Sequence, residues 1–354
     1  MKKISRRQLL KNTAAGIGAI TLGQIITSCS PAPTASPTPL PPTTAPTLPS
    51  TPTTQPQPTA TSAPLATEPL KPTPTITSAP TATSIPPEMV VARGSDPEQL
   101  VRKALEAIGG MDKFIKPGAK VVIKPNICVA YHTYEYAATT NPWVIAALVK
   151  LCKEAGAASV RVFDYPFGGT AKDAYAKSGI EAQVKAAGGE MVIMSDYKFV
   201  PTDIKKGKDL KNIMIYDEIL KADAIINVPI AKHHNLARYT LSMKNLMGVI
   251  DDRIGIHRNV GQRLADLATV IKPTLNVVDA IRVLTNNGPT GGNLEDVKKL
   301  DTIVVTPDIV AADAYAATLF GKQPYDLTYV VAGAAMGLGK MDLKTIRIEE
   351  IKVG

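Results

Sequence analysis

The chain has 354 residues, of which 40 are Lys or Arg and 31 are Asp or Glu, so its formal net charge is +9. Five of the basic residues and none of the acidic ones lie in the first eleven positions, which leaves 35 basic against 31 acidic residues, or +4, for the rest. Because this surplus is small and does not form runs, and because no aromatic-basic motif is present, we expect no nucleic-acid partner.

The first 29 residues have the features of an export signal. Residues 5–11 read Ser-Arg-Arg-Gln-Leu-Leu-Lys, the twin-arginine pattern, and the apolar run 13–27 is too short to span a membrane comfortably. The residues before Cys29 resemble the lipobox at which bacterial signal peptidases cut before an acylated cysteine. We predict export by the twin-arginine pathway and lipid anchoring to the membrane of the cell envelope through Cys29. A plain signal peptide and an uncleaved anchor remain alternatives, and both also predict export.

Residues 30–88 form a linker that is rich in Pro and Thr. Between Pro31 and Pro87 lie 18 of the 29 prolines, and Glu68 and Lys71 are the only charged residues. This composition cannot form a core, and it is typical of a disordered, extended tether. We therefore expect a stalk that holds the following domain away from the membrane.

Residues 89–354 show alternating helix and strand patterns. A helix is predicted from Asp96 to Ile108, then a strand at 120–124, then a helix that Thr140 or Asn141 caps and that ends at Gly156. Further strands are predicted at 159–163, 190–194, 224–228, 274–278 and 302–305, and further helices at 171–187, 260–271 and 310–320. This alternation predicts an α/β domain with a largely parallel sheet flanked by helices. A domain of this size can divide into two lobes, although no linker-like stretch marks a boundary.

Besides Cys29, the chain contains only Cys128 and Cys152, and it has no C-x-x-C motif. An iron-sulfur cluster needs about four thiolates at short spacings, so we expect no such cluster on this chain. Cys152 lies on the apolar stripe of the predicted helix after Asn141, which favours two buried thiols. A disulfide between them is the alternative.

Polar residues gather where the predicted strands end. In parallel α/β sheets, ligands bind beyond the carboxyl ends of the strands, to which helix N-termini also point. The candidates for an anion-binding site there are Lys124, Asn126, Thr140, Asn141, Asp164, Lys232, His233 and Asn245. Lysines beside helix N-termini favour a small anionic ligand, such as a carboxylate or a phosphate.

Three of the four histidines lie between positions 233 and 257, among Lys232 and Lys244. A single histidine is more often an ordinary surface or core residue, but the clustering favours a functional site. A buried lysine there would have a lowered pKa, and neutral imidazoles could bind metal or transfer protons. We therefore assign His234, Lys244 and His257 as candidate catalytic residues, and the two histidines also as candidate metal ligands.

Five segments resemble the bacterial and archaeal family called domain of unknown function 362. They read Ile-Lys-Pro-Asn at 123–126, Thr-Asn-Pro at 140–142, Asn-Val-Pro at 227–229, Met-Lys-Asn-Leu-Met-Gly at 243–248 and Ala-Ala-Asp-Ala at 311–314. The resemblance covers nearly all of residues 89–354. Members often carry a ferredoxin-type cluster segment, which this chain lacks, so a redox role would require a separate redox partner.

A second similarity is to lactate racemases that hold a nickel-pincer nucleotide. In those enzymes a Thr/Pro-rich loop is followed by a histidine, a lysine and a histidine that hold the cofactor, and the lysine is attached to it covalently. Here residues 139–142 match the loop, and His234, Lys244 and His257 follow in the same order at intervals of ten and thirteen positions. The resemblance implies this cofactor, which the residues alone leave unknown.

Together these patterns predict an envelope-anchored enzyme that binds a small anionic substrate or cofactor and transfers a proton or a hydride. No Ser or Cys occupies a recognisable nucleophile elbow, which argues against acyl transfer. The alternative is a ligand-binding lipoprotein without catalysis. Convergence of the histidines around one buried lysine would favour catalysis, and a cleft between two lobes would favour binding.

Overall fold

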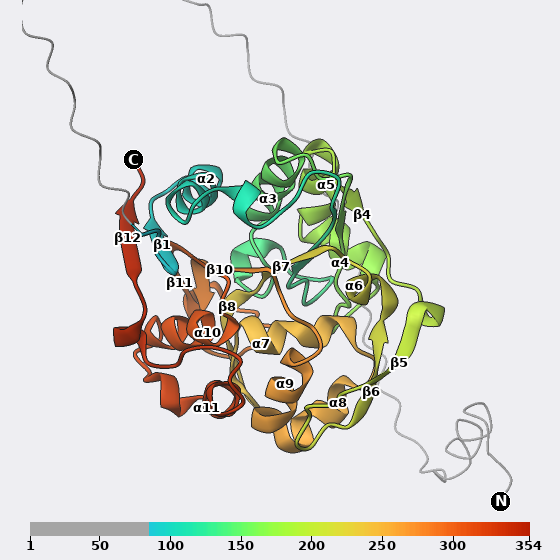
Figure 1. The fold of residues 1–354 in the computed structure, drawn as a ribbon. Helices are drawn as coiled ribbons and strands as arrows, with labels where there is room; N and C mark the ends of the chain where they lie inside the picture. Colours follow the sequence, from blue (N-terminus) through green and yellow to red (C-terminus); the bar gives the residue numbers. More distant parts are fainter. Residues whose placement is uncertain (1–84) are drawn as a thin grey trace, which may run out of the picture. The chain divides into compact units, whose positions relative to one another are not determined.

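Short runs rich in Val and Ile form the strands of residues 85–354, the part of the chain that the computed structural model describes. The strands are β1 (Met89–Arg93), β2 (Lys120–Pro125), β3 (Ser159–Val162), β4 (Glu190–Met191), β5 (Phe199–Asp203), β6 (Asn212–Tyr216), β7 (Ala224–Val228), β8 (Ile230–His234), β9 (Arg238–Thr240), β10 (Leu275–Leu284), β11 (Val297–Thr306) and β12 (Ile348–Lys352) (Figure 1). The predicted export signal, Cys29 and nearly all of the predicted stalk lie outside the described residues.

The helices alternate with the strands along most of the chain. They are α2 (Pro97–Ala107), α3 (Pro142–Glu154), α4 (Ala171–Lys177), α5 (Ile180–Ala186), α6 (Asp217–Leu220), α7 (Ser242–Asn245), α8 (Arg253–Ile256), α9 (Val260–Ala268), α10 (Ile309–Thr318) and α11 (Thr328–Ala335). Among residues 85–354, none of the helices combines the length and the apolar composition that crossing a bilayer requires.

The main sheet has the strand order β12-β1-β11-β10-β7-β2-β3-β4, with β8 and β9 branching from β10. Strands β10, β7, β2, β3 and β4 are parallel neighbours, and β8 also runs parallel to β10. Strand β11 runs antiparallel to both β1 and β10. The predicted α/β class with a largely parallel sheet is therefore confirmed. The antiparallel pairs of the strand order from β12 to β4 are those that β11 forms with β1 and β10.

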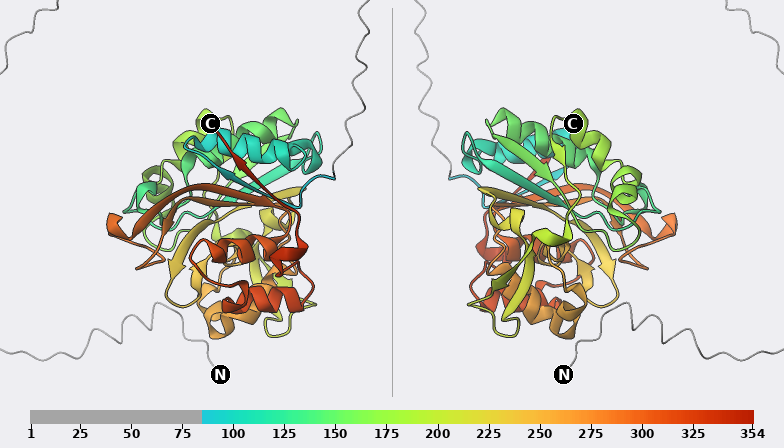
Figure 2. Two further views of the ribbon diagram at one scale, coloured as in Figure 1. Left: turned by 90° about the vertical axis from the view of Figure 1, so that its left-hand side faces the viewer. Right: turned by 90° about the vertical axis from the view of Figure 1, so that its right-hand side faces the viewer.

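Both faces of the sheet are apolar because helices cover both. In β1, Met89 and Val91 belong to one apolar cluster, and the alternate residues Val90 and Ala92 belong to the other, as the period of two in a strand requires. Figure 2 shows the sheet nearly edge-on, with α2 and α3 in blue-green on one side and α10 and α11 in orange-red on the other. The two layers share one continuous sheet.

Several predicted elements have the expected bounds. Strand β7 covers the predicted residues 224–228, and Asp96 caps α2 by accepting hydrogen bonds from the N–H groups of Glu98 and Gln99. The predicted helix 171–187 is instead divided into α4 and α5. Gly179, with a φ of 76°, separates them, because a left-handed residue cannot continue a right-handed helix.

The segment after β7 contains a strand that the sequence did not predict at residues 232–234. They lie in β8, a second strand that begins directly after Pro229 and pairs with β9 and β10. Because side chains alternate along a strand, Lys232 and His234 share one side and His233 points to the other. Strand β8 therefore separates two histidines that are adjacent in the sequence.

Cys128 and Cys152 are both buried and both free. The expectation of two buried thiols is therefore correct, and the alternative of a disulfide is not.

Candidate functional site

The carboxyl ends of β2, β3 and β7 meet at one edge because these strands are parallel neighbours. Asn126 follows β2, Asp164 lies just beyond β3, and β8 continues from β7. Helix α7, which carries Lys244 and Asn245, is held there by Asp313 of α10, whose two carboxylate oxygens accept hydrogen bonds from the N–H groups of Ser242 and Met243. The arrangement of the sheet thus brings distant polar residues together.

A cavity of about 430 Å³ opens at this edge. Its lining includes seven of the residues predicted for the site, namely Asn126, Asp164, Lys232, His234, Lys244, Asn245 and His257. The three candidate catalytic residues therefore share one cavity, although their chemical role remains a prediction.

Lys124 lies beneath the cavity and is 1% exposed. Its ammonium group donates to Asp164 Oδ1 at 2.7 Å, to the Pro125 carbonyl at 2.8 Å and to Asn245 Oδ1 at 3.1 Å. The second oxygen of Asp164 accepts from the N–H of Ile127 at 2.6 Å. Since an ammonium has three donors and all are used, Lys124 supports the floor of the site and has no donor left for a ligand.

Gly248 makes the close packing of this floor possible. A Cβ atom at Gly248 would overlap Asp164 Oδ1 and crowd the ammonium of Lys124, so any larger residue would displace the ion pair. Its carbonyl also accepts from the N–H of Tyr165 at 3.1 Å, which holds the loop after β3 against the loop after α7.

A chain of side-chain amides joins the strand ends. Asn245 accepts from Asn126 at 3.0 Å and donates to Asn227 at 2.9 Å, and Asn227 donates to Asn276 at 3.1 Å. Asn126 Oδ1 is buried and has no hydrogen-bond partner among residues 85–354. Because an unpaired buried acceptor is costly, this oxygen is available to a donor group of a ligand.

His234 and His257 stack in the cavity with their ring centroids 5.6 Å apart and their planes at 22°. His234 Nδ1 accepts from the N–H groups of Leu236 at 3.1 Å and Ala237 at 3.4 Å, which places the proton of the neutral ring on Nε2. His257 Nδ1 lies 3.0 Å from the carbonyl of Arg253, so it donates, and Nε2 carries the lone pair. That Nε2 atom is buried without a partner among the described residues.

Burial keeps both rings neutral. Burial and the nearby Lys244 and Lys232 lower the pKa of His234 to about 2. Burial and Lys244 also lower the pKa of His257. At neutral pH, the pair therefore offers one N–H donor, on His234, and one nitrogen acceptor, on His257.

Lys244 is the least satisfied cation of the site. It is 7% exposed, and within residues 85–354 it forms neither a hydrogen bond nor an ion pair through its ammonium group. Burial, followed by repulsion from Lys232 and Arg253, lowers its pKa to about 7. A buried charge without a partner is unfavourable, so an anion that paired with it would be bound with a large electrostatic gain.

Two further cations border the cavity. Lys232 donates to the carbonyls of Ala138 at 2.6 Å and Pro289 at 3.0 Å. Arg253 donates to the carbonyl of Tyr165 at 3.0 Å, and its guanidinium lies 4.3 Å from the centre of the Tyr165 ring. Since Asp164 is already paired with Lys124, the lining has a net positive charge that suits an anionic ligand.

Besides Lys124, which lies beneath it, three predicted residues do not line this cavity. Thr140 Oγ1 accepts from the N–H of Asn126 at 2.8 Å and donates to the carbonyl of Val228 at 2.9 Å, so it fixes the loop after β2. His233 lies on the other side of β8, where Nδ1 accepts from the N–H of Gly288 at 3.1 Å. Asn141 caps α3 by accepting from the N–H of Trp143. Sequence reasoning assigned these groups to a ligand, whereas the fold itself uses them.

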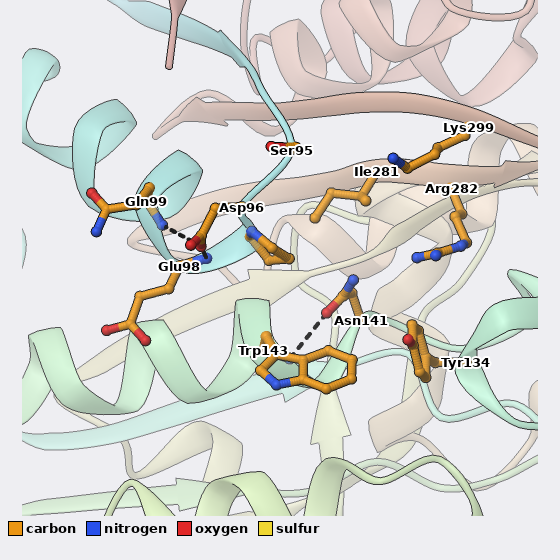
Figure 3. Close-up of a pocket in the computed structure, with 11 residues that line it drawn as sticks. Ser95, Asp96, Glu98, Gln99, Tyr134, Asn141, Trp143, Ile281, Arg282 and Lys299 are labelled. Carbon is orange, nitrogen blue, oxygen red and sulfur yellow. Dashed lines mark hydrogen bonds between the residues drawn. The ribbon is translucent and has the colours of Figure 1, made fainter. Parts of the chain in front are cut away.

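Asn141 borders a second and larger cavity of about 550 Å³, which Figure 3 shows between α2, α3 and β10. Three of its charged groups have partners: Asp96 caps α2, Glu98 pairs with Lys150 at 2.7 Å, and Lys299 pairs with Asp301 at 3.1 Å. The half-buried Arg282 forms no ion pair within residues 85–354, and its guanidinium lies 5.3 Å from the centre of the Tyr134 ring. Because no buried unpaired charge faces it, the smaller cavity around Lys244 is the better candidate for chemistry.

Arg253 is a charged cavity residue that sequence reasoning missed. Arg253 lies in the polar stretch Asp-Asp-Arg at 251–253. No predicted strand comes directly before this stretch, so the rule that ligands bind at strand ends did not point to it. Only the folded arrangement brings this side chain next to the loop after β3.

Comparison with known proteins identifies the family. The model of the family "Domain of unknown function (DUF362)" matches residues 121–318, which include β7, α7, α10 and all but the first residue of β2. The chain belongs to this family. A thylakoid-associated protein of Synechocystis sp. is 28% identical to this DUF362 protein over 247 residues, which cover 67% of the chain and 74% of the relative.

Two solved structures are similar to this DUF362 protein. The lactate racemase apoprotein of Thermoanaerobacterium thermosaccharolyticum has a TM-score of 0.39 and 12% identity, and the match covers 62% of this chain and 54% of that one. A protein of Thermotoga maritima has a TM-score of 0.33 and 14% identity, with 52% of this chain and 51% of the other covered. The match thus spans about half the length of each solved structure.

Proposed function

We propose that this DUF362 protein is an enzyme that binds a small organic anion and transfers a proton to or from it. The observation that carries the proposal is the position of Lys244, a buried lysine without a partner among the described residues, in one cavity with the neutral His234 and His257. This is the convergence that favours catalysis over simple binding.

Each group has a distinct task in this proposal. The ammonium of Lys244 attracts the carboxylate or phosphate of the ligand and is assisted by Lys232 and Arg253. The free Nε2 of His257 accepts a proton from the bound anion. The Nε2–H of His234 donates a hydrogen bond to the oxygen on which negative charge then develops, and a neutral imidazole can do this.

Solvent exchange distinguishes this enzyme from a ligand-binding protein without catalysis. We expect the purified protein in D₂O to introduce deuterium into a bound carboxylate whose C–H bond is next to a carbonyl carbon. The measurement is mass spectrometry of the recovered anion, with a His257→Gln variant as the matched control because it removes the base but keeps a polar side chain. Binding without exchange in the natural protein would support the ligand-binding alternative.

The nickel-pincer nucleotide fits the residues of this cavity in one respect. Lys244 has no competing partner and could carry the group covalently, with His234 and His257 beside it. When bound, such a group would supply an acceptor for hydride. Among residues 85–354, no group of three or more His, Cys, Asp or Glu side chains could hold a metal ion, so a metal bound through His234 and His257 would need a further ligand.

The location proposed for the protein is the cell envelope, reached by the twin-arginine pathway and kept by a lipid on Cys29. The name of the thylakoid-associated relative is in keeping with a position at a membrane.

One experiment tests both the anchor and the cofactor. The intact mass of the protein purified from its own membranes should correspond to a chain that begins at Cys29 and carries lipid. A Cys29→Ala variant should appear in the soluble fraction. An additional mass that disappears in a Lys244→Arg variant would support the nucleotide, and a Lys244 peptide without any adduct would contradict it.

A further inference from the structure

The rim of the candidate cavity is lined by large apolar side chains that face water. Phe167 is 70% exposed, Leu236 is 67% exposed and Ile254 is 84% exposed, and Tyr165 beside them is 36% exposed. All of them line the cavity that contains Lys244. They are therefore part of the same site as the cationic groups.

These side chains come from three separate segments of the chain. Tyr165 and Phe167 lie in the loop after β3, Leu236 lies in the turn between β8 and β9, and Ile254 lies in α8. Single exposed apolar residues are common on protein surfaces and need no explanation. Three segments that bring such residues to the mouth of one cavity are different, because exposed apolar clusters mark binding surfaces.

The apolar surface continues from the rim into the cavity. Ile127, which is fully buried, and Met247, which is 5% exposed, also line it. The cavity thus combines the cationic groups of Lys232, Lys244 and Arg253 with apolar side chains that reach the solvent. A small hydrophilic anion would pair with the cationic groups but would leave the apolar side chains uncovered.

We propose that the ligand of this cavity is an amphiphilic anion, with a carboxylate or phosphate head near Lys244 and a hydrocarbon tail that lies against Phe167, Leu236 and Ile254. The inference rests on the proposed function for the site of the head group. It adds the class of ligand, because the rim would cover the apolar part of the molecule.

The rim is better suited to a ligand tail than to a protein partner. Its apolar residues are continuous with the interior of the cavity through Met247 and Ile127, so one molecule can occupy both parts. The net positive lining beside them complements a charged head group. A partner protein or a second copy of the chain would cover the rim but would leave the buried Lys244 without an anion.

Calorimetric titration of the full chain with methyl phosphate and with octyl phosphate, the latter below its micelle concentration, tests the proposal. Each fully buried methylene group strengthens binding by about threefold to fourfold. We expect octyl phosphate to bind at least about tenfold more tightly, which requires the burial of only about two methylene groups. Hexanoate against acetate provides the same comparison for a carboxylate head.

The matched variants are Phe167→Ser with Ile254→Ser at the rim, and Tyr197→Ser as a control. Tyr197 is 92% exposed and does not line the cavity. The rim variant should lose most of the advantage of octyl phosphate and should bind methyl phosphate as the natural protein does. The control should keep the advantage. Because the exchanged side chains are exposed, all three proteins should unfold at the same denaturant concentration.

The outcomes separate this inference from the proposed function. If neither phosphate nor carboxylate binds, the proposed function fails. The short and long anions could bind equally, or the rim variant could still bind octyl phosphate more tightly than methyl phosphate by the same factor as the natural protein. Either result would contradict the proposal of an amphiphilic ligand but would leave the proposed anion site unchanged. If the rim variant instead abolishes self-association of the natural protein without changing anion binding, the rim is a contact between copies and the inference is overturned.

Discussion

The Lys244→Ala variant is expected to bind a small carboxylate or phosphate about thirtyfold or more weakly than the natural protein, because the loss of one partner of a buried charge pair costs about 2–5 kcal/mol. Within residues 85–354, no carboxylate is among the groups that shift the pKa of Lys244, so the substitution breaks no internal ion pair. It also removes a poorly solvated charge. The free energy of unfolding should therefore remain the same or increase, as is common for a residue retained for function.

Two control variants show whether the loss of anion binding comes from the charge of Lys244. Lys244→Met keeps the apolar stem of the side chain and should show the same loss of anion binding. Lys221→Ala removes a lysine that is largely exposed and pairs only with Asp217, so it should leave anion binding unchanged. If Lys244→Ala unfolds, or if it binds the anion normally, Lys244 has a structural role and the proposed site fails.

The pH dependence separates the charge of Lys244 from its bulk. The pKa of the Lys244 side chain is about 7 in the folded protein, whereas its ordinary value of 10.5 applies to the unfolded chain. Between these values the unfolded chain holds a proton that the folded chain lacks, so the natural protein gains stability as the pH rises through this window, and Lys244→Met should not. Anion affinity should change in the opposite sense, because the neutral amine above pH 7 no longer attracts the ligand.

Periodicity and capping were sufficient to predict much of the fold. The apolar run 224–228 is buried on both faces and became β7, and Asn141 with Pro142 marked the start of α3. The same signals failed at β8, because its residues Lys232, His233 and His234 are polar and have no strand-like pattern. That strand forms because β9 and β10 offer it backbone partners, which only the tertiary structure provides.

The candidate site could be predicted in part. The rule that ligands bind beyond parallel strands pointed to Asn126, and the clustering of the histidines pointed to Lys244 and His257. All three line one cavity. The rule could not distinguish polar residues that are free to bind a ligand from those that form hydrogen bonds within the fold. Thr140 fixes the loop after β2, and Lys124 uses its three donors within the floor. Hydrogen-bond partners decide this difference, and sequence spacing does not contain them.

The Asp164→Asn variant is expected to lower the free energy of unfolding by about 3–5 kcal/mol, the usual cost of leaving one member of a buried ion pair alone. Each oxygen of Asp164 accepts one donor: Lys124 Nζ at 2.7 Å and the N–H of Ile127 at 2.6 Å. An asparagine has a single oxygen, so its NH₂ group must face one of these donors. Denaturant unfolding measures the loss, and Asp203→Asn, the same exchange at an exposed carboxylate, should have almost no effect.

A second substitution tests whether the loss comes from the ion pair. In the double variant Lys124→Met with Asp164→Asn, the new amide oxygen can still accept from Ile127, and its NH₂ group no longer faces an ammonium. The double variant should therefore be destabilised by less than the sum of the two single variants, since residues in direct contact are coupled. Additive losses would show that Lys124 and Asp164 act separately. A loss from Asp164→Asn no larger than that of Asp203→Asn would show that the pair does not support the floor of the cavity.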